Sequence, residues 1–336
     1  MTIPAAPAAR STSRLTRRTP FRALLVGLSM AGASTLWLAP ELLGLATTSP
    51  FAQLVAFRPA TAAGQLALAT LACLARRRWW PAALAMGGVA AVALGAVVPR
   101  AVAGPTAPPG PYLSILSFNV LHGRADPGAL AEAIHAHRPD VVVLPEAGHR
   151  FRERLDPLVG ELGYRSWATT AVGQKEGAGI VVLSAARLGA VSATPVDLGG
   201  RFRWMRLSGG ELGDVGIVAV HTAAPVRRWM PGWAVELGLL RTWLAEGAGP
   251  HVVVGDLNAT LDHAPLRAAL AGARDVAAEV GEGLTSTWPT AWPRWLGVQI
   301  DHVLVSGGVR PAAARVLDLP GSDHRALLAR VVLPST

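Results

Sequence analysis

The sequence predicts a layered α/β domain that follows an apolar, membrane-embedded N-terminal third. From Tyr112 onward, short all-apolar strands alternate with helical segments, which is typical of α/β folds with well-covered sheets. Residues 21–98 contain three long apolar stretches. The basic excess lies in the same part of the chain: ten arginines and one acid precede Tyr112, whereas 21 basic and 21 acidic residues follow from there.

The apolar stretches cover about residues 21–45, 55–74 and 79–98. A helix needs about 20 apolar residues to cross the hydrocarbon core, so we expect about three transmembrane helices over residues 21–98, the second being the weakest. The alternative is a signal peptide followed by apolar core helices. The first stretch is longer than the apolar region of a signal peptide, which has roughly 7–15 residues, and this favours the membrane interpretation.

The distribution of arginines predicts the orientation of these helices. A basic tail over residues 1–20 and a triple arginine at residues 76–78 are expected in the cytoplasm, because positive loops stay inside. Three crossings then place the rest of the chain outside, behind a Pro- and Gly-rich linker over residues 99–111. The expected location is the cell membrane, multi-pass, with residues 112–333 extracytoplasmic. This placement depends on a full crossing by the second stretch.

The domain over residues 112–333 is expected to begin with a strand and then alternate. Strands are predicted over residues 113–120, 140–146, 178–185, 216–223, 251–260, 300–306 and 325–333. Helices are predicted over residues 126–139, 150–163 and 229–246. Asp126 as N-cap and Pro127 at the first helical position mark the start of the first helix.

Polar residues gather at the ends of these strands. Taken singly, each is an ordinary turn former or surface residue. Taken together, they lie where α/β sheets present ligand sites, and they fit one chemistry, the attack of water on a phosphate ester. The residues concerned are Asn119, Glu146, His221, Asp256, Asn258, Asp301, His302, Asp323 and His324.

Hydrolysis of a phosphate ester needs a hard cation and a residue that positions the water. Carboxylate and amide oxygens such as those of Glu146 and Asn119 suit the cation. The carboxylate of Asp256 suits the water. The sequence has no Gly-x-Ser-x-Gly, P-loop or dinucleotide motif, and its only cysteine, Cys73, lies in the apolar third. These absences disfavour serine, cysteine and nucleotide-dependent chemistry.

The reaction also needs donors to the phosphoryl oxygens. His221, His324 and Asn258 fit that role. Asp301 is suited to hold the imidazole of His324 in one orientation.

The motifs SFNV, LPE, VHT, GDLN, IDHVLV and SDH follow one another in this order. In this order they resemble the endonuclease/exonuclease/phosphatase superfamily of metal-dependent phosphoesterases, over residues 112–333. GDLN followed by SDH is the most specific part. The resemblance implies a four-layer α/β sandwich and dependence on Mg²⁺ or Mn²⁺.

The same resemblance implies roles for individual residues. Asn119 and Glu146 correspond to the pair next to the metal, and Asp323 is a further acid expected at the metal. Asp256 corresponds to the residue that activates or positions the water. Asn258 corresponds to the residue that holds the scissile phosphate.

The remaining site residues complete the catalytic set. By the resemblance, His221 binds phosphate, and Asp301 and His324 are the closing acid and histidine. His122 and Arg124, in the segment NVLHGRAD, are either additional phosphate contacts or plain loop residues.

Charge and tryptophans suggest the substrate. The neutral catalytic domain disfavours nucleic acid, whose binding usually needs many basic contacts. Tryptophans beside arginines suit the headgroup region of a membrane, although packing in the core is the alternative. We therefore expect a lipid-linked or cell-envelope phosphate ester, with Trp229 and Trp288 as substrate contacts. The tryptophans near the site motifs are Trp229, Trp233, Trp288, Trp292 and Trp295.

Two alternatives remain open. The first is a surface-anchored endonuclease or exonuclease acting on DNA, in which the same tryptophans stack on bases. The second is an envelope-binding or glycopeptide-resistance accessory protein, because the layout is similar to that of membrane proteins linked to glycopeptide resistance. The complete set of site residues argues against a role in binding alone.

Overall fold

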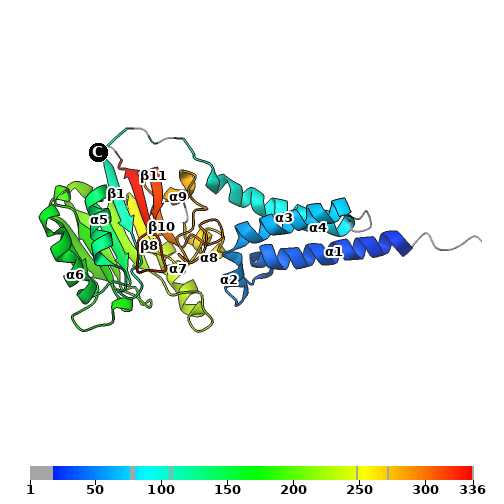
Figure 1. Ribbon diagram of the computed structural model, residues 1–336, viewed down its shortest axis with the longest axis horizontal. Helices are drawn as coiled ribbons and strands as arrows, with labels where there is room; N and C mark the ends of the chain where they lie inside the picture. Colours follow the sequence, from blue (N-terminus) through cyan, green and yellow to red (C-terminus); the bar gives the residue numbers. More distant parts are fainter. Residues whose placement is uncertain are drawn as a thin grey trace, which may run out of the picture.

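The computed structural model describes residues 18–75, 80–105, 107, 109–246, 249–270 and 272–334. Most of the predicted basic tail (residues 1–17) and the triple arginine at residues 76–78 lie outside the described residues. The described chain forms an α/β sandwich, and a bundle of apolar helices projects from one side of it (Figure 1).

Two six-stranded sheets form the centre of the sandwich. The first sheet has the strand order β11-β12-β1-β2-β4-β3, and the second has the order β5-β6-β7-β8-β10-β9. The strands of the first sheet are β1 (Tyr112–Ser117), β2 (Val141–Pro145), β3 (Arg165–Ala168), β4 (Ile180–Ser184), β11 (Arg310–Leu317) and β12 (Ala326–Val332). Those of the second are β5 (Val191–Val196), β6 (Trp204–Gly209), β7 (Gly216–His221), β8 (His251–Asp256), β9 (Arg274–Asp275) and β10 (Asp301–Val305).

Helices cover the outer face of each sheet, which gives the expected four layers. Helices α5 (Pro127–His137) and α6 (His149–Val159) pack on the first sheet, and α7 (Met230–Glu246) and α8 (Ala264–Leu270) pack on the second (Figure 1). A short helix, α9 (Val276–Glu279), follows β9. A core of valine, leucine and isoleucine fills the space between the sheets. Because both faces of the central strands are covered, these strands are mostly apolar.

Each sheet contains one parallel pair of strands, β1 with β2 and β7 with β8. The carboxyl ends of these four strands meet at one edge of the sandwich. This is shown by the hydrogen bond from Asn119, which follows β1, to Asp256 at the end of β8. Strand β10 runs antiparallel to β8 and places Asp301 opposite Asp256. The fold therefore brings the polar strand ends together at this edge.

The N-terminal third forms α1 (Arg18–Leu38), α2 (Phe51–Val55), α3 (Arg58–Ala75) and α4 (Trp80–Val97). Helices α1 and α3 pack against α4, with Leu38, Ala62 and Ala90 buried among them. Within the described residues, one helical segment, Trp80–Ala101, is long and apolar enough to cross a membrane, with 22 residues and a mean hydropathy of 2.0.

The prediction of about three transmembrane helices is therefore wrong. The apolar part of α1, Arg22–Leu38, is shorter than that of α4. Most of the second apolar stretch forms α3, which begins at Arg58, a buried charge that needs polar partners.

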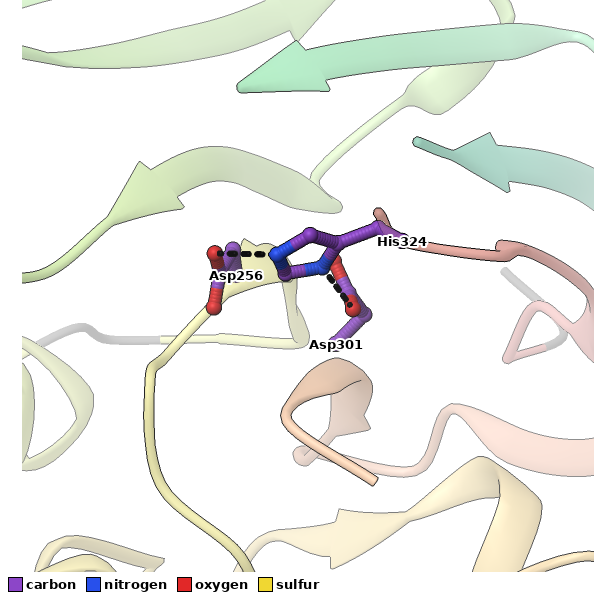
Figure 2. A group of neighbouring side chains, drawn as sticks. All are labelled: Asp256, Asp301 and His324. Carbon is purple, nitrogen blue, oxygen red and sulfur yellow. Dashed lines mark hydrogen bonds and ion pairs between the residues drawn. The ribbon is translucent and has the colours of Figure 1, made fainter. Parts of the chain in front are cut away.

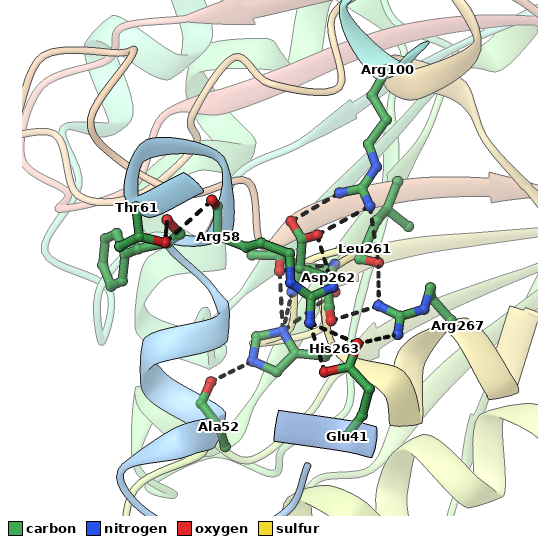
Figure 3. Close-up of polar contacts among 11 residues, drawn as sticks. Glu41, Ala52, Arg58, Thr61, Arg100, Leu261, Asp262, His263 and Arg267 are labelled. Atoms are coloured by element: carbon green, nitrogen blue, oxygen red, sulfur yellow. Dashed lines mark hydrogen bonds and ion pairs between the residues drawn. The ribbon is translucent and has the colours of Figure 1, made fainter. Parts of the chain in front are cut away.

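A cluster of buried charges joins the helical bundle to the sandwich (Figure 3). Arg58 donates to both carboxylate oxygens of Glu41 at 2.7 Å and lies 3.4 Å from Asp262. Arg100 donates to Asp262 at 2.9 Å, and Arg267 donates to Glu41 at 3.0 Å. Removing one partner of such a buried pair costs about 3–5 kcal/mol, because the other charge stays buried alone. The bundle is thus held to the loop that follows β8.

The first half of the predicted linker also contacts the sandwich. The amide of Gly104 donates to the carbonyl of Glu279 at 2.8 Å, and Ala103 forms a bridge with Val280. The amide of Gly283 donates to the carbonyl of Arg100 at 3.0 Å. Residues 100–104 are therefore docked on the domain that the linker was expected to tether.

His263, next to the charge cluster, is a second contact between the bundle and the sandwich. Its Nδ1 accepts from the amide of Thr260 at 2.8 Å, so the proton lies on Nε2, which is 2.8 Å from the carbonyl oxygen of Ala52 (Figure 3). The ring meets that of Trp233 edge-on, with centroids 5.1 Å apart. Burial lowers the pKa of His263 to about 4, so the folded protein holds this side chain neutral.

This lowered pKa predicts a loss of stability in acid. Because the unfolded chain takes up the His263 proton near pH 6.5 and the folded chain only near pH 4, stability falls as the pH decreases through this interval. The loss from His263 between about pH 7.5 and about pH 5 is about 2 kcal/mol. We expect His263→Gln to unfold at a temperature that changes less between these pH values than that of the unsubstituted protein. Exposed His137→Gln is the control and should show the same pH effect as the unsubstituted protein. An equal pH effect in His263→Gln and in the unsubstituted protein would contradict the lowered pKa of His263.

Candidate active site

A cavity of about 650 Å³ opens at the edge where the polar strand ends meet. Most of the predicted site residues line it, and Asn119 and Asp301 lie just behind its wall, in contact with residues that do. The predicted residues in the wall are His122, Glu146, His221, Trp229, Asp256, Asn258, Trp288, Asp323 and His324.

Asp256 is the centre of the hydrogen-bond network in this cavity. Its side chain is almost completely buried. The amide nitrogen Nδ2 of Asn119 donates to Oδ2 of Asp256 at 2.9 Å and lies 3.1 Å from Oε1 of Glu146. The backbone amide of Asn258 donates to Oδ1 of Asp256 at 2.8 Å. Asn119 therefore fixes two carboxylates that come from different sheets.

The backbone around this network explains the GDLN motif. Gly255 has φ 143°, and a Cβ there would lie 1.9 Å from the carbonyl oxygen of Val220, so only glycine fits. Asn258 and Glu146 have φ values of 46° and 60°, in the left-handed region that non-glycine residues rarely adopt. Such conformations cost about 1–3 kcal/mol each and concentrate at functional sites.

His324 and Asp301 form a hydrogen-bonded pair beside Asp256 (Figure 2). Nδ1 of His324 lies 2.9 Å from Oδ2 of Asp301, and Nε2 lies 3.8 Å from Oδ2 of Asp256. Burial alone would lower the pKa of His324, but the carboxylates of Asp301 and Asp256 raise it to about 10. The imidazole is therefore protonated at neutral pH, and it can donate to an anion. Asp301 lies where it can orient the ring of His324, and its role in the reaction stays a prediction.

The other two titrating groups respond to the same surroundings. Burial and the charge of Asp301 raise the pKa of Asp256. Burial and the charge of His324 lower the pKa of His221 to about 3, so His221 is neutral at pH 7. Nε2 of His221 lies 3.8 Å from Asp256, and its ring stacks on Phe202 with centroids 4.1 Å apart.

The residues of the cavity fit a hard divalent cation. Carboxylates of Glu146, Asp256, Asp301 and Asp323 converge there, and the positive charges beside them are those of protonated His324 and of Arg201. Within the described chain, the buried Oδ1 atoms of Asp301 and Asp323 have no hydrogen-bond partner. Carboxylate and amide oxygens are the ligands that such cations prefer.

The tightest group of candidate ligands differs from the set expected from sequence. Asp256, Asp301 and His324 offer ligand atoms that all lie within 4.8 Å of one another. Since Nδ1 of His324 is already bonded to Asp301, we interpret this group as an oriented histidine beside an acid. The metal set Asn119, Glu146 and Asp323 stays a prediction.

The predicted substrate contacts differ in where they lie. His122 is exposed at the rim, where Nδ1 lies 2.6 Å from Oε2 of Glu146. Trp288 donates from Nε1 to Oδ2 of Asp323 at 3.0 Å, so it orients this acid. Trp229 lines the cavity, whereas Arg124 is exposed and is not part of the wall. Roles in substrate binding stay predictions for all four.

Strand alternation and packing separate two residues from the site. His302 follows Asp301 in β10 and therefore points away, bonding to Asp275 at 2.7 Å. Trp233 belongs to α7 and is fully buried between this helix and the second sheet, so it is not a surface tryptophan.

Several residues of the cavity were not predicted from sequence. Arg201 and Phe202 belong to an irregular loop between β5 and β6, and the guanidinium of Arg201 lies 4.0 Å from the ring centroid of Trp229. Gln53 and Phe57 belong to the apolar N-terminal third. These segments carry no recognisable motif, and only the fold shows that they reach the site.

Comparison with known families and structures agrees with this geometry. The model of the endonuclease/exonuclease/phosphatase family matches residues 116–324, which is more than half of the chain. No curated protein gives a significant sequence match.

Solved structures support the fold. D. rerio TDP2 humanized by 14 mutations shares 18% identity and a TM-score of 0.53, covering 66% of this chain and 99% of that protein. An endonuclease/exonuclease/phosphatase from Beutenbergia cavernae DSM 12333 shares 23% identity and a TM-score of 0.51, covering 67% and 72%. An AP endonuclease from Archaeoglobus fulgidus shares 17% identity and a TM-score of 0.51, covering 65% and 98%.

The family match confirms the expectation of a divalent-metal-dependent hydrolase that acts on phosphate ester bonds. With its two sheets, its covering helices and its converging acids and histidines, the chain belongs to the endonuclease/exonuclease/phosphatase family.

Proposed function

We propose that this protein is a membrane-anchored, extracytoplasmic phosphoesterase that hydrolyses a lipid-linked or cell-envelope phosphate ester. One observation carries the proposal: the N-terminal helical region forms part of the wall of the catalytic cavity. Ala52, Gln53, Ala56 and Phe57, in α2 and the turn after it, line the same cavity as Asp256. A substrate that reaches Asp256 therefore passes beside the segment that carries the anchor.

The charge around α4 supports the proposed orientation. Three arginines at residues 76–78 precede this helix, whereas only Arg100 follows it before the catalytic domain. By the positive-inside rule, the start of α4 stays in the cytoplasm, and a single crossing by α4 places the catalytic domain outside. Trp292 and Trp295 are 44% and 77% exposed, which suits side chains at the headgroup level.

We assign the roles of the residues from the geometry. Mg²⁺ or Mn²⁺, held by Glu146, Asn119 and Asp323, would offset the charge of the phosphate. Asp256 accepts a proton from the attacking water, helped by its raised pKa. Protonated His324 donates to a phosphoryl oxygen.

Two further residues are proposed to contact the scissile phosphate. Neutral His221 faces Asp256 from the end of β7 and offers a donor at Nε2. Asn258 is held by a bond from its Nδ2 to the carbonyl of Thr222 at 2.9 Å.

DNA cleavage is the second candidate function. Among the similar solved structures is D. rerio TDP2 complexed with single-strand DNA product, with 16% identity and a TM-score of 0.52. In this chain, Trp229 and Phe202 provide aromatic rings in the cavity wall, on which bases can stack. The equal numbers of acids and bases after Tyr112 disfavour this function.

A substrate comparison tests the proposal. The full chain, purified in detergent with Mg²⁺ or Mn²⁺, is expected to hydrolyse phospholipids or polyprenyl phosphates in mixed micelles faster than it nicks plasmid DNA. The physical reason is that the anchor region beside the cavity brings lipid, and not a polyanion, to Asp256. Nicking of DNA with the lipids untouched would establish the nuclease instead.

Asp256→Asn is expected to reduce kcat about a thousandfold, because the amide cannot accept the proton of the attacking water. Exposed Asp197→Asn serves as control and should retain full turnover. Unchanged turnover in Asp256→Asn would sink the assignment of the base. If the protein acts in the envelope only by binding, a cellular phenotype should survive Asp256→Asn.

Metal binding is expected to raise the unfolding temperature. At ten times its Kd, a bound ion stabilises the folded state by about 1.4 kcal/mol. In Glu146→Gln, adding Mg²⁺ or Mn²⁺ should raise the unfolding temperature less than in the unsubstituted protein, and a chelator should lower it less. Glu153→Gln, on the exposed face of α6, should behave like the unsubstituted protein. Equal shifts in both variants would place the ion elsewhere.

A further inference from the structure

A second cavity, of about 600 Å³, lies where α3 meets the catalytic domain. One wall consists of the turn before α3 and one face of that helix, including Phe57, Ala60, Ala63, Gly64 and Ala67. The opposite wall comes from the loop before β10, including Trp295, Leu296, Val298 and Gln299. We call this cavity the α3 groove.

The α3 groove adjoins the catalytic cavity. Ala56, Phe57 and Val298 line both cavities. The ring of Phe57 packs against that of Trp292, with centroids 5.8 Å apart, at the boundary between them. The two cavities therefore lie side by side, the catalytic one at Asp256 and the α3 groove along the apolar helix.

The two faces of α3 have different neighbours. Ala62, Leu66 and Ala69 face α4, where Ala62 and Ala69 are buried. The groove face carries only small side chains from residue 59 to residue 67, a length of about 12 Å along the helix. A Cβ added at Gly64 meets no atom within 4 Å, so the groove is open there. The small residues thus leave space that no other described element fills.

The polar groups of the groove are few, and most are already paired. Arg100 donates to Asp262 at 2.9 Å, so its guanidinium is already paired and is not free for an anionic ligand. The exception is Gln299, which is 6% exposed and whose Oε1 has no partner among the described residues. Gln299 lies between Val298, which lines both cavities, and Ile300, which lines the catalytic one. An unpaired acceptor at this junction suits a donor near the polar end of a ligand.

We propose that the α3 groove binds the hydrocarbon chain of the substrate while its phosphate lies at Asp256. The inference rests on the proposed function and specifies it: the substrate is a phosphate ester with a long alkyl or prenyl chain. Three observations support this occupant: the apolar walls, the three lining residues that the groove shares with the catalytic cavity, and the position of the groove along a helix of the anchor region. An apolar chain gains affinity from such a groove by leaving water.

The test uses a series of substrates with one reacting group. The full chain in detergent receives p-nitrophenyl phosphate diesters of ethanol, octanol and hexadecanol, with Mg²⁺ or Mn²⁺. We expect kcat/KM to rise with chain length, by up to about fourfold for each CH₂ that enters the groove. Gly64→Leu and, separately, Ala63→Trp should lower kcat/KM for the hexadecyl ester at least about tenfold and leave the ethyl ester unchanged, since they fill only the groove.

Leu71→Trp is the matched control, because Leu71 is exposed on α3 and lines neither cavity. It should retain the full dependence on chain length. No dependence in the unsubstituted protein, no loss in the groove variants, or an equal loss in Leu71→Trp would overturn the groove proposal while hydrolysis of the ethyl ester upholds the phosphoesterase. No metal-dependent hydrolysis of any ester would overturn the proposed function and this inference with it. Unfolding temperatures confirm that each variant is folded.

Discussion

The hydrogen bonds from Asn119 to Asp256 and Glu146 are the constraint on which the site depends. They join the carboxyl ends of β1 and β2 in one sheet to the end of β8 in the other. Both carboxylates are held at this edge, where burial and the charge of Asp301 raise the pKa of Asp256. A divalent cation would offset the negative charge gathered at this edge, so the geometry suits a metal. The left-handed backbone at Glu146 shows that the fold maintains this arrangement against local preference.

The loop after β8 connects this site with the helical bundle. Its first residues hold the network at Asp256 and Asn258, and Asp262 a few positions later pairs with Arg58 and Arg100. The loop is held at both ends, so a displacement of the bundle at Asp262 would be transmitted over few residues to the carboxylate of Asp256. Removing the N-terminal third would leave Asp262 unpaired and one wall of the cavity missing. We infer that the catalytic domain and the bundle work as one unit.

Local pattern explains what the sequence revealed. The apolar strands that end in polar residues were recognised because each strand and the residues at its end are adjacent in the sequence. The order of the family motifs supplied the roles expected for Asp256 and His324. What escaped detection depends on pairs that are distant in sequence. Arg58 and Asp262 are 204 residues apart, and nothing near Arg58 indicates that its partner lies in the catalytic domain. Arg58, at the start of the second apolar stretch, was expected at a membrane boundary. It is instead buried in the interface between the bundle and the sandwich, where it pairs with Asp262.

The side chains in the walls of the cavity favour a lipid-linked substrate over a nucleic acid strand. A nucleic acid strand needs an open groove with basic side chains along its length. Here the side of the cavity at Phe57 is lined by apolar side chains, and the exposed rings of Trp292 and Trp295 lie in the same part of the molecule. Such a surface gains free energy in contact with lipid and loses it in contact with a hydrated polyanion. In the proposed function, a lipid-linked phosphate ester would approach Asp256 along this side with its hydrocarbon chain against apolar side chains.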